Sequence, residues 1–241
     1  MKIRREIEPR PRVEIRRVRD GVQLRVDGTL ASFQRPGHAL TGPVWWALAG
    51  PILFVPRRRR RVLLLGVGGG SVARALRALD LRAEIVGVEF DPEVLRLARR
   101  HFGLDALRLE LVVDDALDVL SRERRGFDLI VEDLFIGPSR SVRKPPWLVG
   151  EGYRLIRKRL RAGGIVVSNT IHETPAVVDA LRPLGAPIVS FDVHGHWNRI
   201  IACGRSLPPP REIARVFRDT DELAKPSRKL AFRLVPPRRP R

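Results

Sequence analysis

The sequence predicts an α/β fold in which strands and helices alternate to build a doubly wound, mostly parallel sheet. Three observations predict it. An apolar run at 62–65 ends in the glycine cluster G-V-G-G-G-S at 66–71, a helical pattern follows, and a second apolar run ends at Glu89. A strand, a glycine-rich turn, a helix and a strand closed by a carboxylate form the arrangement that binds a nucleoside through its ribose.

The alternation continues downstream of this unit. Strands are expected at 62–65, 83–89, 108–113, 127–132 and 165–169, with helices at 71–79, 92–102, 116–120, 148–160 and 175–184. Two final strands, at 188–193 and 199–203, are separated only by H-G-H-W-N. That spacing suits a hairpin and not a helical crossover, so the last strand is expected to be antiparallel. The prediction is a sheet of about seven strands.

Two smaller regions flank this domain, which is expected at 44–205. Residues 1–43 contain short alternating segments with turn signals at Asp20-Gly21 and Asp27-Gly28, which predicts a small β-meander. Residues 206–241 form a basic, proline- and arginine-rich extension with one amphipathic piece at 211–218 and a tail of disordered composition.

Composition favours one α/β domain with small additions, because the chain has 241 residues and 44% apolar content. No apolar run reaches the ~20 residues of a membrane span, and the N-terminus has no apolar core of a secretory signal. The single cysteine, Cys203, excludes an intrachain disulfide and a multi-cysteine metal site. We expect a cytoplasmic protein without a metal.

The net charge of +19 has two interpretations. Only five of the 46 basic residues are lysine, which a GC-rich genome produces without selection for binding. The alternative is an anionic partner such as RNA. The arginines are spread over the whole chain, which favours the compositional interpretation and leaves a nucleic-acid partner open.

The glycine cluster and the acid after the second strand are the first candidate binding residues. Gly66, Gly68 and Gly70 let the backbone turn sharply and approach a ligand without a Cβ in the way. Glu89 lies where a carboxylate accepts hydrogen bonds from both ribose hydroxyls. Phe90 is expected either to cover one face of a purine or to join the core. A nicotinamide dinucleotide, or a turn without a ligand, fits these residues as well.

Acids after the third and fourth strands separate the cofactors. Asp114 and Asp115 close the third strand, and Glu132 and Asp133 close the fourth. A nicotinamide fold does not require acids at both places. A sulfonium nucleoside site can use one for the adenine amino group and the other beside the reacting amine or the positive sulfonium. The acids therefore favour a sulfonium nucleoside.

Four segments carry a family resemblance in their order and spacing: V-L-L-L-G-V-G-G-G (62–70), V-E-F-D-P-E-V (88–94), V-V-D-D-A (112–116) and F-D-L-I-V-E-D (127–133). With the hairpin L-R-V-D-G-T-L and the final R-I-I-A-C-G, the chain resembles spermidine synthases over about 20–204. These polyamine aminopropyltransferases belong to the class I S-adenosylmethionine-dependent methyltransferase superfamily, which has a Rossmann-like fold. The resemblance implies that Glu89 binds the ribose, Asp115 the adenine amine, and that Asp133 deprotonates the attacking amine.

Four places depart from the family's pattern, and one of them is Leu40-Thr41, near which the family's Tyr-His pair would fall. Gly69 stands where the family's loop carries an aspartate that contacts the aminopropyl end, Ile136 replaces an aspartate that grips the polyamine, and Ala31 replaces a glutamine. A diamine needs several carboxylates to offset the desolvation of its ammonium groups. We therefore expect an altered acceptor pocket, and Gly69 tilts the donor toward S-adenosylmethionine over its decarboxylated form.

The other acceptor-pocket candidates follow the late strands. They are Glu132, Trp147, Asn169 and His172, with packing as an equal alternative for Trp147. The sequence thus predicts an enzyme that moves a methyl or aminopropyl group from S-adenosylmethionine or its decarboxylated form to a small acceptor, an amine by the resemblance. An inactive nucleoside-binding or regulatory protein and an RNA-directed methyltransferase stay open. The family's dimers suggest a homodimer.

Overall fold

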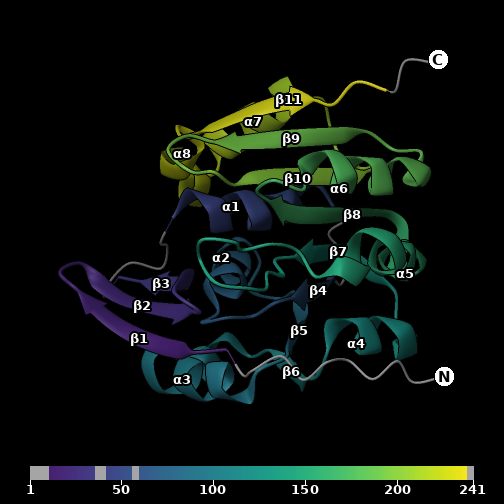
Figure 1. The fold of residues 1–241 in the computed structure, drawn as a ribbon. Helices are drawn as coiled ribbons and strands as arrows, with labels where there is room; N and C mark the ends of the chain where they lie inside the picture. The colour runs from purple at the N-terminus through teal and green to yellow at the C-terminus, as the bar shows by residue number, and fades with distance from the viewer. Residues whose placement is uncertain (1–10, 36–41, 56–59, 238–241) are drawn as a thin grey trace.

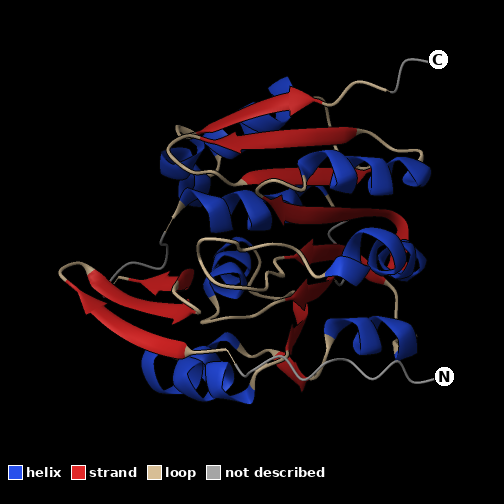
Figure 2. Ribbon diagram, in the orientation of Figure 1, coloured by secondary structure: helices blue, strands red, loops and turns tan. Residues whose placement is uncertain are grey.

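Two β-sheets organise the protein in the computed structural model, which describes residues 11–35, 42–55 and 60–237 (Figure 1). A small antiparallel sheet comes first in the chain and lies beside one edge of a larger, mixed sheet. Helices cover both faces of the larger sheet (Figure 2). The doubly wound α/β architecture predicted from the alternation of strands and helices is confirmed.

The small sheet is the predicted meander. Its strands are β1 (Val13–Val18), β2 (Gly21–Val26) and β3 (Thr29–Gln34). The β2–β3 turn has positive φ at Asp27 (47°) and Gly28 (78°), the conformation of a tight hairpin turn. Leu24 on its inner face is fully buried against Val94 and Phe102 of helix α3 (Pro92–Phe102), so the small sheet packs onto the nucleoside-binding half of the domain.

Eight strands form the larger sheet in the order β11-β9-β10-β8-β7-β4-β5-β6. In chain order they are β4 (Arg61–Leu65), β5 (Glu84–Glu89), β6 (Glu110–Val113), β7 (Phe127–Glu132), β8 (Leu160–Thr170), β9 (Ile188–Val193), β10 (Arg199–Gly204) and β11 (Leu230–Leu234). The other helices are α1 (Pro43–Ala49), α2 (Ser71–Leu79), α4 (Ala116–Arg122), α5 (Tyr153–Arg159), α6 (Thr174–Leu181), α7 (Pro210–Asp219) and α8 (Asp221–Ser227). Short 3-10 or π turns are η1 (Gly50–Phe54), η2 (Leu104–Leu107), η3 (Leu148–Gly152) and η4 (Arg182–Leu184).

The order in which parallel strands are added to the sheet reverses at β4. Strands β5 and β6 continue on one side of β4, and β7 and β8 on the other, all parallel. The loops after β4 and β7 therefore lead to opposite sides of the sheet. Ligands of such sheets bind in the crevice at this point, outside the carboxyl ends of the strands.

The apolar strands are buried on both faces. Val62 and Leu64 of β4 pack with α1, α2, α7 and α8, whereas Leu63 and Leu65 pack with α4, α5 and α6. A strand covered by helices on both faces reads as a continuous apolar run, which is why 62–65 shows no alternation. The core thus fixes β4 at the centre of the sheet.

The end of the sheet that contains β9, β10 and β11 is antiparallel, as predicted for the last strand. The whole sheet has eight strands, one more than the seven expected. Strand β10 is antiparallel to β8 and β9, and β11 is antiparallel to β9. Phe232 of β11 packs edge-on against Phe191 and Phe217, with ring centroids 4.8 and 5.1 Å apart. The amphipathic piece expected at 211–218 lies within α7, whereas the expected disordered tail is wrong where α8 and β11 form, because apolar side chains such as Leu223, Leu230 and Phe232 anchor them to the core.

Across the three described segments, none of the helices is both long enough and apolar enough to cross a bilayer.

Candidate functional site

The carboxyl edge of the parallel strands gathers the predicted site residues. The glycine cluster follows β4, Glu89 ends β5, and Asp114 and Asp115 follow β6. Glu132 ends β7, Asp133 follows it, and Asn169 is the last residue but one of β8. Parallel strands bring their carboxyl ends to one edge, so segments far apart in the sequence meet there. The small sheet lies beside this edge (Figure 1).

The glycine loop adopts backbone conformations that favour glycine. Gly66, Gly68 and Gly70 have φ values of 87°, 53° and 84°. Gly66 donates to the Val88 carbonyl oxygen (2.9 Å), and a Cβ on Gly66 would lie 2.7 Å from the Asp133 carbonyl oxygen. The loop therefore runs against both neighbouring strands, and α2 begins directly after Gly70.

Glu89 holds this loop through backbone groups. Its Oε2 accepts hydrogen bonds from Val67 N (3.2 Å) and Gly68 N (2.9 Å), and its Oε1 accepts from Phe90 N (3.0 Å) and Asp91 N (3.3 Å). Burial of the carboxylate raises the pKa of Glu89, and these backbone hydrogen bonds oppose the rise. An ionised carboxylate has about four lone-pair directions, so ribose hydroxyls must share them with the loop.

Two exposed apolar side chains flank Glu89. Phe90 is 66% exposed and Val113, which pairs with Glu89 across β5 and β6, is 52% exposed. Phe90 therefore does not belong to the core, which leaves the predicted stacking role. Val113 was not predicted, because it reads as the end of a buried strand. Apolar side chains at this edge provide faces for a flat ring.

The two acids after β6 have different partners. Asp115 is the N-cap of α4 and accepts a hydrogen bond from Leu117 N (2.8 Å). Asp114 forms an ion pair with Arg122 (2.5 Å), and the Arg122 hydrogen bond lowers the pKa of Asp114. The ion pair with Arg122 holds the Asp114 side chain at the surface of α4. Asp115 stays the candidate that the family resemblance assigns to the adenine amine.

Asp133 stands at the end of β7 with one side-chain partner among the described residues. Its Oδ1 accepts a hydrogen bond from Asn169 Nδ2 (2.7 Å), and Asn169 Oδ1 accepts one from Asn198 Nδ2 (2.9 Å). Burial raises the pKa of Asp133, while the Asn169 hydrogen bond and the Lys144 charge lower it. A carboxyl group with a raised pKa is suited to take up a proton.

The side chain of Glu132 lies on the opposite face of the sheet from that of Asp133 and is fully buried. Its Oε1 accepts from Lys144 Nζ (2.6 Å) and Leu134 N (2.8 Å), and its Oε2 accepts from Tyr153 Oη (3.2 Å). Tyr153 also donates to Ser168 Oγ (2.8 Å). These hydrogen bonds connect the loop after β7 with helix α5 and strand β8. They correct the predicted acceptor-pocket place of Glu132, whose oxygens are committed inside the fold.

Of the two remaining acceptor-pocket candidates, Trp147 packs against the core and His172 is exposed. Trp147 is half-buried and packs on the core cluster of α4, α5 and α6, so its packing alternative holds. His172 is exposed just after β8, next to Glu173, whose Oε1 accepts from Lys144 N (3.1 Å). His172 therefore stays a candidate acceptor contact.

Strand β3 closes the position of the missing aspartate. Gly69 N donates to Ser32 Oγ (2.7 Å) inside the protein, and a Cβ on Gly69 would lie 2.7 Å from Ser32 Cβ and 3.2 Å from Phe102 Cδ1. Phe33 N also donates to Ser71 Oγ (3.3 Å). The small sheet is thus pinned onto the glycine loop, with no room for a side chain at Gly69.

The sequence reasoning missed Ser32, Lys144, Tyr153 and Asn198. Composition carried a signal for two of them: Tyr153 is the only tyrosine of the chain, and Lys144 is one of five lysines among 46 basic residues. Nothing in the local sequence marks Ser32 or Asn198, because their partners lie 37 and 29 residues away.

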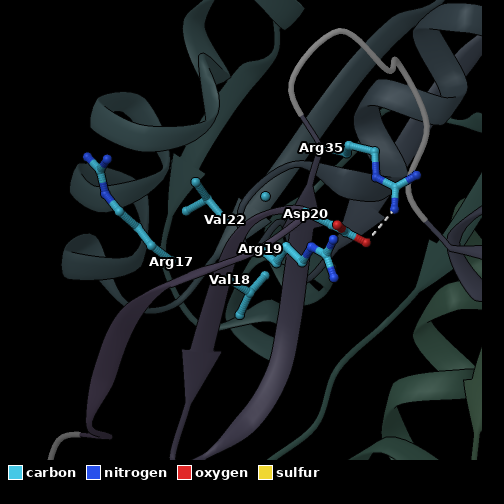
Figure 3. Close-up of a pocket in the computed structure, with 7 residues that line it drawn as sticks. Arg17, Val18, Arg19, Asp20, Val22 and Arg35 are labelled. Carbon is cyan, nitrogen blue, oxygen red and sulfur yellow. Dashed lines mark hydrogen bonds and ion pairs between the residues drawn. The ribbon is translucent and has the colours of Figure 1, made fainter.

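The small sheet carries a hollow that lies away from the acids of the carboxyl edge. No cluster of three potential metal ligands occurs within residues 11–35, 42–55 and 60–237. A hollow of about 570 Å³ lies at the β1–β2 turn, where Arg35 pairs with Asp20 (2.7 Å) while Arg17 points away from that pair (Figure 3). Because the hollow sits on the small sheet, it does not extend the nucleoside edge.

Comparisons with known proteins identify the family of this chain. The family described as "Methyltransferase domain" matches residues 62–144, which include the glycine loop, Glu89, Asp115 and Asp133. Polyamine aminopropyltransferase 2 of Caldanaerobacter subterraneus subsp. tengcongensis is 31% identical over 236 residues, covering 86% of this chain and 77% of that protein.

Other relatives are matched over less of their own length. The polyamine aminopropyltransferase of Mycobacterium tuberculosis is 30% identical over 209 residues, covering 79% of this chain and 38% of the relative. An eEF1A lysine and N-terminal methyltransferase homolog of Drosophila melanogaster is 36% identical over 165 residues, covering 61% of this chain and 24% of the relative.

The fold has solved counterparts. A probable spermidine synthase from Corynebacterium glutamicum superposes with a TM-score of 0.73 at 18% identity, covering 93% of this chain and 88% of that one. At this identity the likeness supports the fold alone.

Proposed function

The chain belongs to the polyamine aminopropyltransferase family, with the S-adenosylmethionine-dependent methyltransferase fold, and from this premise we propose that it transfers an alkyl group, methyl or aminopropyl, from an S-adenosyl sulfonium donor to a small amine. One observation carries the proposal. A single sheet edge holds a glycine loop anchored by Glu89, the helix cap Asp115 and the carboxyl group of Asp133.

The residues of β4, β5 and β6 fit a nucleoside. In this proposal Glu89 shares its oxygens between the loop N–H groups and two ribose hydroxyls, and Asp115 accepts a hydrogen bond from the adenine amine. The exposed Phe90 and Val113 offer apolar faces to the purine. The bound donor supplies an electrophilic carbon next to a sulfonium sulfur.

Asp133 serves as the base in this proposal. An alkylamine has a pKa near ~10 and is protonated at neutral pH, so it has no free lone pair. Asp133 removes a proton from the amine nitrogen, the nitrogen forms a bond to the donor carbon, and the carbon–sulfur bond breaks with its electrons on sulfur. Alignment of nitrogen, carbon and sulfur supplies the rest of the rate enhancement.

The acceptor side departs from what a diamine needs. Ile136, at the place of a second aspartate, forms an isolated bridge with Arg143, through Ile136 N to Arg143 O (2.8 Å) and the reverse (3.0 Å). An arginine therefore borders the position where a carboxylate would neutralise a distal ammonium. This favours an amine acceptor with a single positive group.

A second candidate is methyl transfer to an amine of a protein. The Drosophila relative is named as a lysine and N-terminal methyltransferase homolog. Ser32 fills the space beside Gly69, which leaves no side chain there to pair with the ammonium of an aminopropyl group. This contact favours the methyl donor.

A transfer assay tests the proposal. The full chain is incubated with S-adenosylmethionine or its decarboxylated form, each with a panel of monoamines, diamines and lysine peptides, and products are identified by mass spectrometry. We expect a methylated or aminopropylated amine with one donor. Donor binding without product across the panel would support the inactive binding protein, and product only with RNA would support the RNA-directed alternative.

A further inference from the structure

The carboxyl group of Asp133 is held asymmetrically. Oδ1 accepts the short hydrogen bond from Asn169 Nδ2 (2.7 Å), whereas no group among the described residues donates to Oδ2. An amide nitrogen can only donate, so it requires Oδ1 to be an acceptor. A proton on Asp133 is thereby restricted to Oδ2.

Asn198 determines which way the Asn169 amide points. Asn198 Nδ2 donates to Asn169 Oδ1 (2.9 Å), and Asn169 is only 4% exposed. A flipped Asn169 would set its oxygen against Asp133 Oδ1 and its nitrogen against Asn198 Nδ2. Both contacts would be repulsive, so the two hydrogen bonds specify the same orientation.

Asn198 itself is held by the base of the β9–β10 hairpin. The next residue, Arg199, pairs with Thr170 of β8 and with Asp192 of β9. Thr170 Oγ1 donates to the Arg199 carbonyl oxygen (2.7 Å). Asn198 also lines a hollow of about 330 Å³ at this hairpin, so the chain of amides runs from solvent to Asp133.

We propose that Asn169 and Asn198 are positioning residues that form an amide relay, which keeps Asp133 Oδ1 an acceptor and directs the proton of the acceptor amine to Oδ2. This assignment replaces the acceptor contact predicted for Asn169. It rests on the proposed role of Asp133 as the base, but the relay can be measured without any transfer reaction.

The charged groups around Asp133 come from three elements. Lys144 precedes η3 and lowers the pKa of Asp133, and Glu132 lies beside it on β7. The hairpin carries exposed His194 and His196, with Asp192 and Arg199 paired at its base (2.5 Å). None of the hairpin charges contacts Asp133, so the relay is the hairpin's hydrogen-bonded path to it among the described residues.

Asn198→Asp tests the relay by reversing one hydrogen bond. The new carboxylate would accept from Asn169, which would flip and present its oxygen to Asp133 Oδ1. Asp133 would then need a proton on Oδ1, so its pKa should rise by about one unit or more. The measurement is a carboxyl ¹³C NMR titration of the full chain, with the Asp133 signal assigned by its loss in Asp133→Asn.

Trp197→Asp is the matched control, because it adds the same single negative charge to the same hairpin at an exposed, neutral residue next to Asn198. We expect it to leave the Asp133 midpoint within about 0.3 units, since exposed charges are screened. Asn198→Ala, which adds no charge, should raise the midpoint by a smaller amount and covers the case in which Asn198→Asp does not fold. An Asp133 midpoint unchanged in both folded Asn198 variants, or one moved equally by Trp197→Asp, would overturn the relay.

The outcomes separate the relay from the proposed function. A shifted midpoint with no alkyl transfer to any acceptor would retain the relay and remove the proposed function. Alkyl transfer by a protein whose Asp133 midpoint does not change in the Asn198 variants would retain the proposed function and remove the relay.

Discussion

The two halves of the carboxyl edge are held together by different groups. On the β4–β5–β6 side, the acids accept hydrogen bonds from backbone groups: Glu89 from four main-chain N–H groups, and Asp115 from Leu117 N. On the β7–β8–β10 side, side chains bind side chains: Asp133 pairs with Asn169, and Glu132 with Lys144. Backbone partners persist whatever residue carries them. The donor side can therefore be retained while substitutions reshape the acceptor side.

On the acceptor side, the neighbouring acids Glu132 and Asp133 lie in different environments. Glu132 and Asp133 alternate across β7, so one side chain enters the core and the other reaches the edge. The buried Glu132 is neutralised by Lys144, and Asp133 keeps one oxygen without a donor among the described residues.

Asp133→Asn should reduce turnover by roughly 10²- to 10⁴-fold, because an amide cannot take up the proton of the amine. Its oxygen can still accept from Asn169, so the fold and donor affinity should persist. The checks are steady-state turnover with the acceptor found in the transfer assay, and donor titration. Asp118→Asn, an exposed acid on α4, is the control and should keep full turnover. Unchanged turnover in Asp133→Asn would remove the base.

Lys144→Met should lower the free energy of unfolding by about 3–5 kcal/mol, because it leaves the Glu132 charge buried and unpaired. Denaturant unfolding measures the loss. Burial already raises the Glu132 pKa above 4.5, and Lys144 opposes that rise. In the variant the folded state binds a proton that the unfolded state releases, so stability should fall as the pH rises above about 4.5.

The double variant Lys144→Met with Glu132→Gln is the control for that loss. Removing both charges should restore part of the stability and flatten its pH dependence. A single variant as stable as the unsubstituted chain at neutral pH would mean that the Glu132 network does not anchor the loop after β7.

Gly69→Ala should cost about 1–3 kcal/mol of stability, because its Cβ would lie 2.7 Å from Ser32 Cβ. Thermal and denaturant unfolding report the cost. Combining it with Ser32→Gly removes the opposing atom and should recover stability beyond the sum of the single effects, an interaction energy that a double-mutant cycle measures. Simple additivity would show that β3 does not close the glycine loop.

The same contrast explains what the sequence could predict. The glycine loop, Glu89 and the Asp115 cap follow from local patterns, since a strand, a turn and a helix start leave signals in adjacent residues. The closing of Gly69 by Ser32 and the relay through Asn198 depend on β3 and β10 meeting distant loops. Residue type alone cannot reveal such contacts, because asparagine and serine are also typical turn residues that need no distant partner.

Strand β11 shows the same limit in the fold. Leu230 and Phe232 lie in a short segment after prolines and charges, which by composition resembles a tail. Their burial depends on Phe191 and Phe217 from two other elements. Glu132 was misplaced for a related reason, because its partner Lys144 lies across a loop and no local pattern pairs them.

The proposed function requires that a sulfonium nucleoside binds at the β4–β5–β6 edge. Isothermal titration calorimetry of the full chain with S-adenosylmethionine and its decarboxylated form, repeated with Glu89→Ala, measures this. We predict binding of at least one donor, weakened at least tenfold, or about 1.4 kcal/mol, in Glu89→Ala, with circular dichroism confirming that the variant is folded. No binding of either donor, or equal affinity with and without the Glu89 carboxylate, would contradict it.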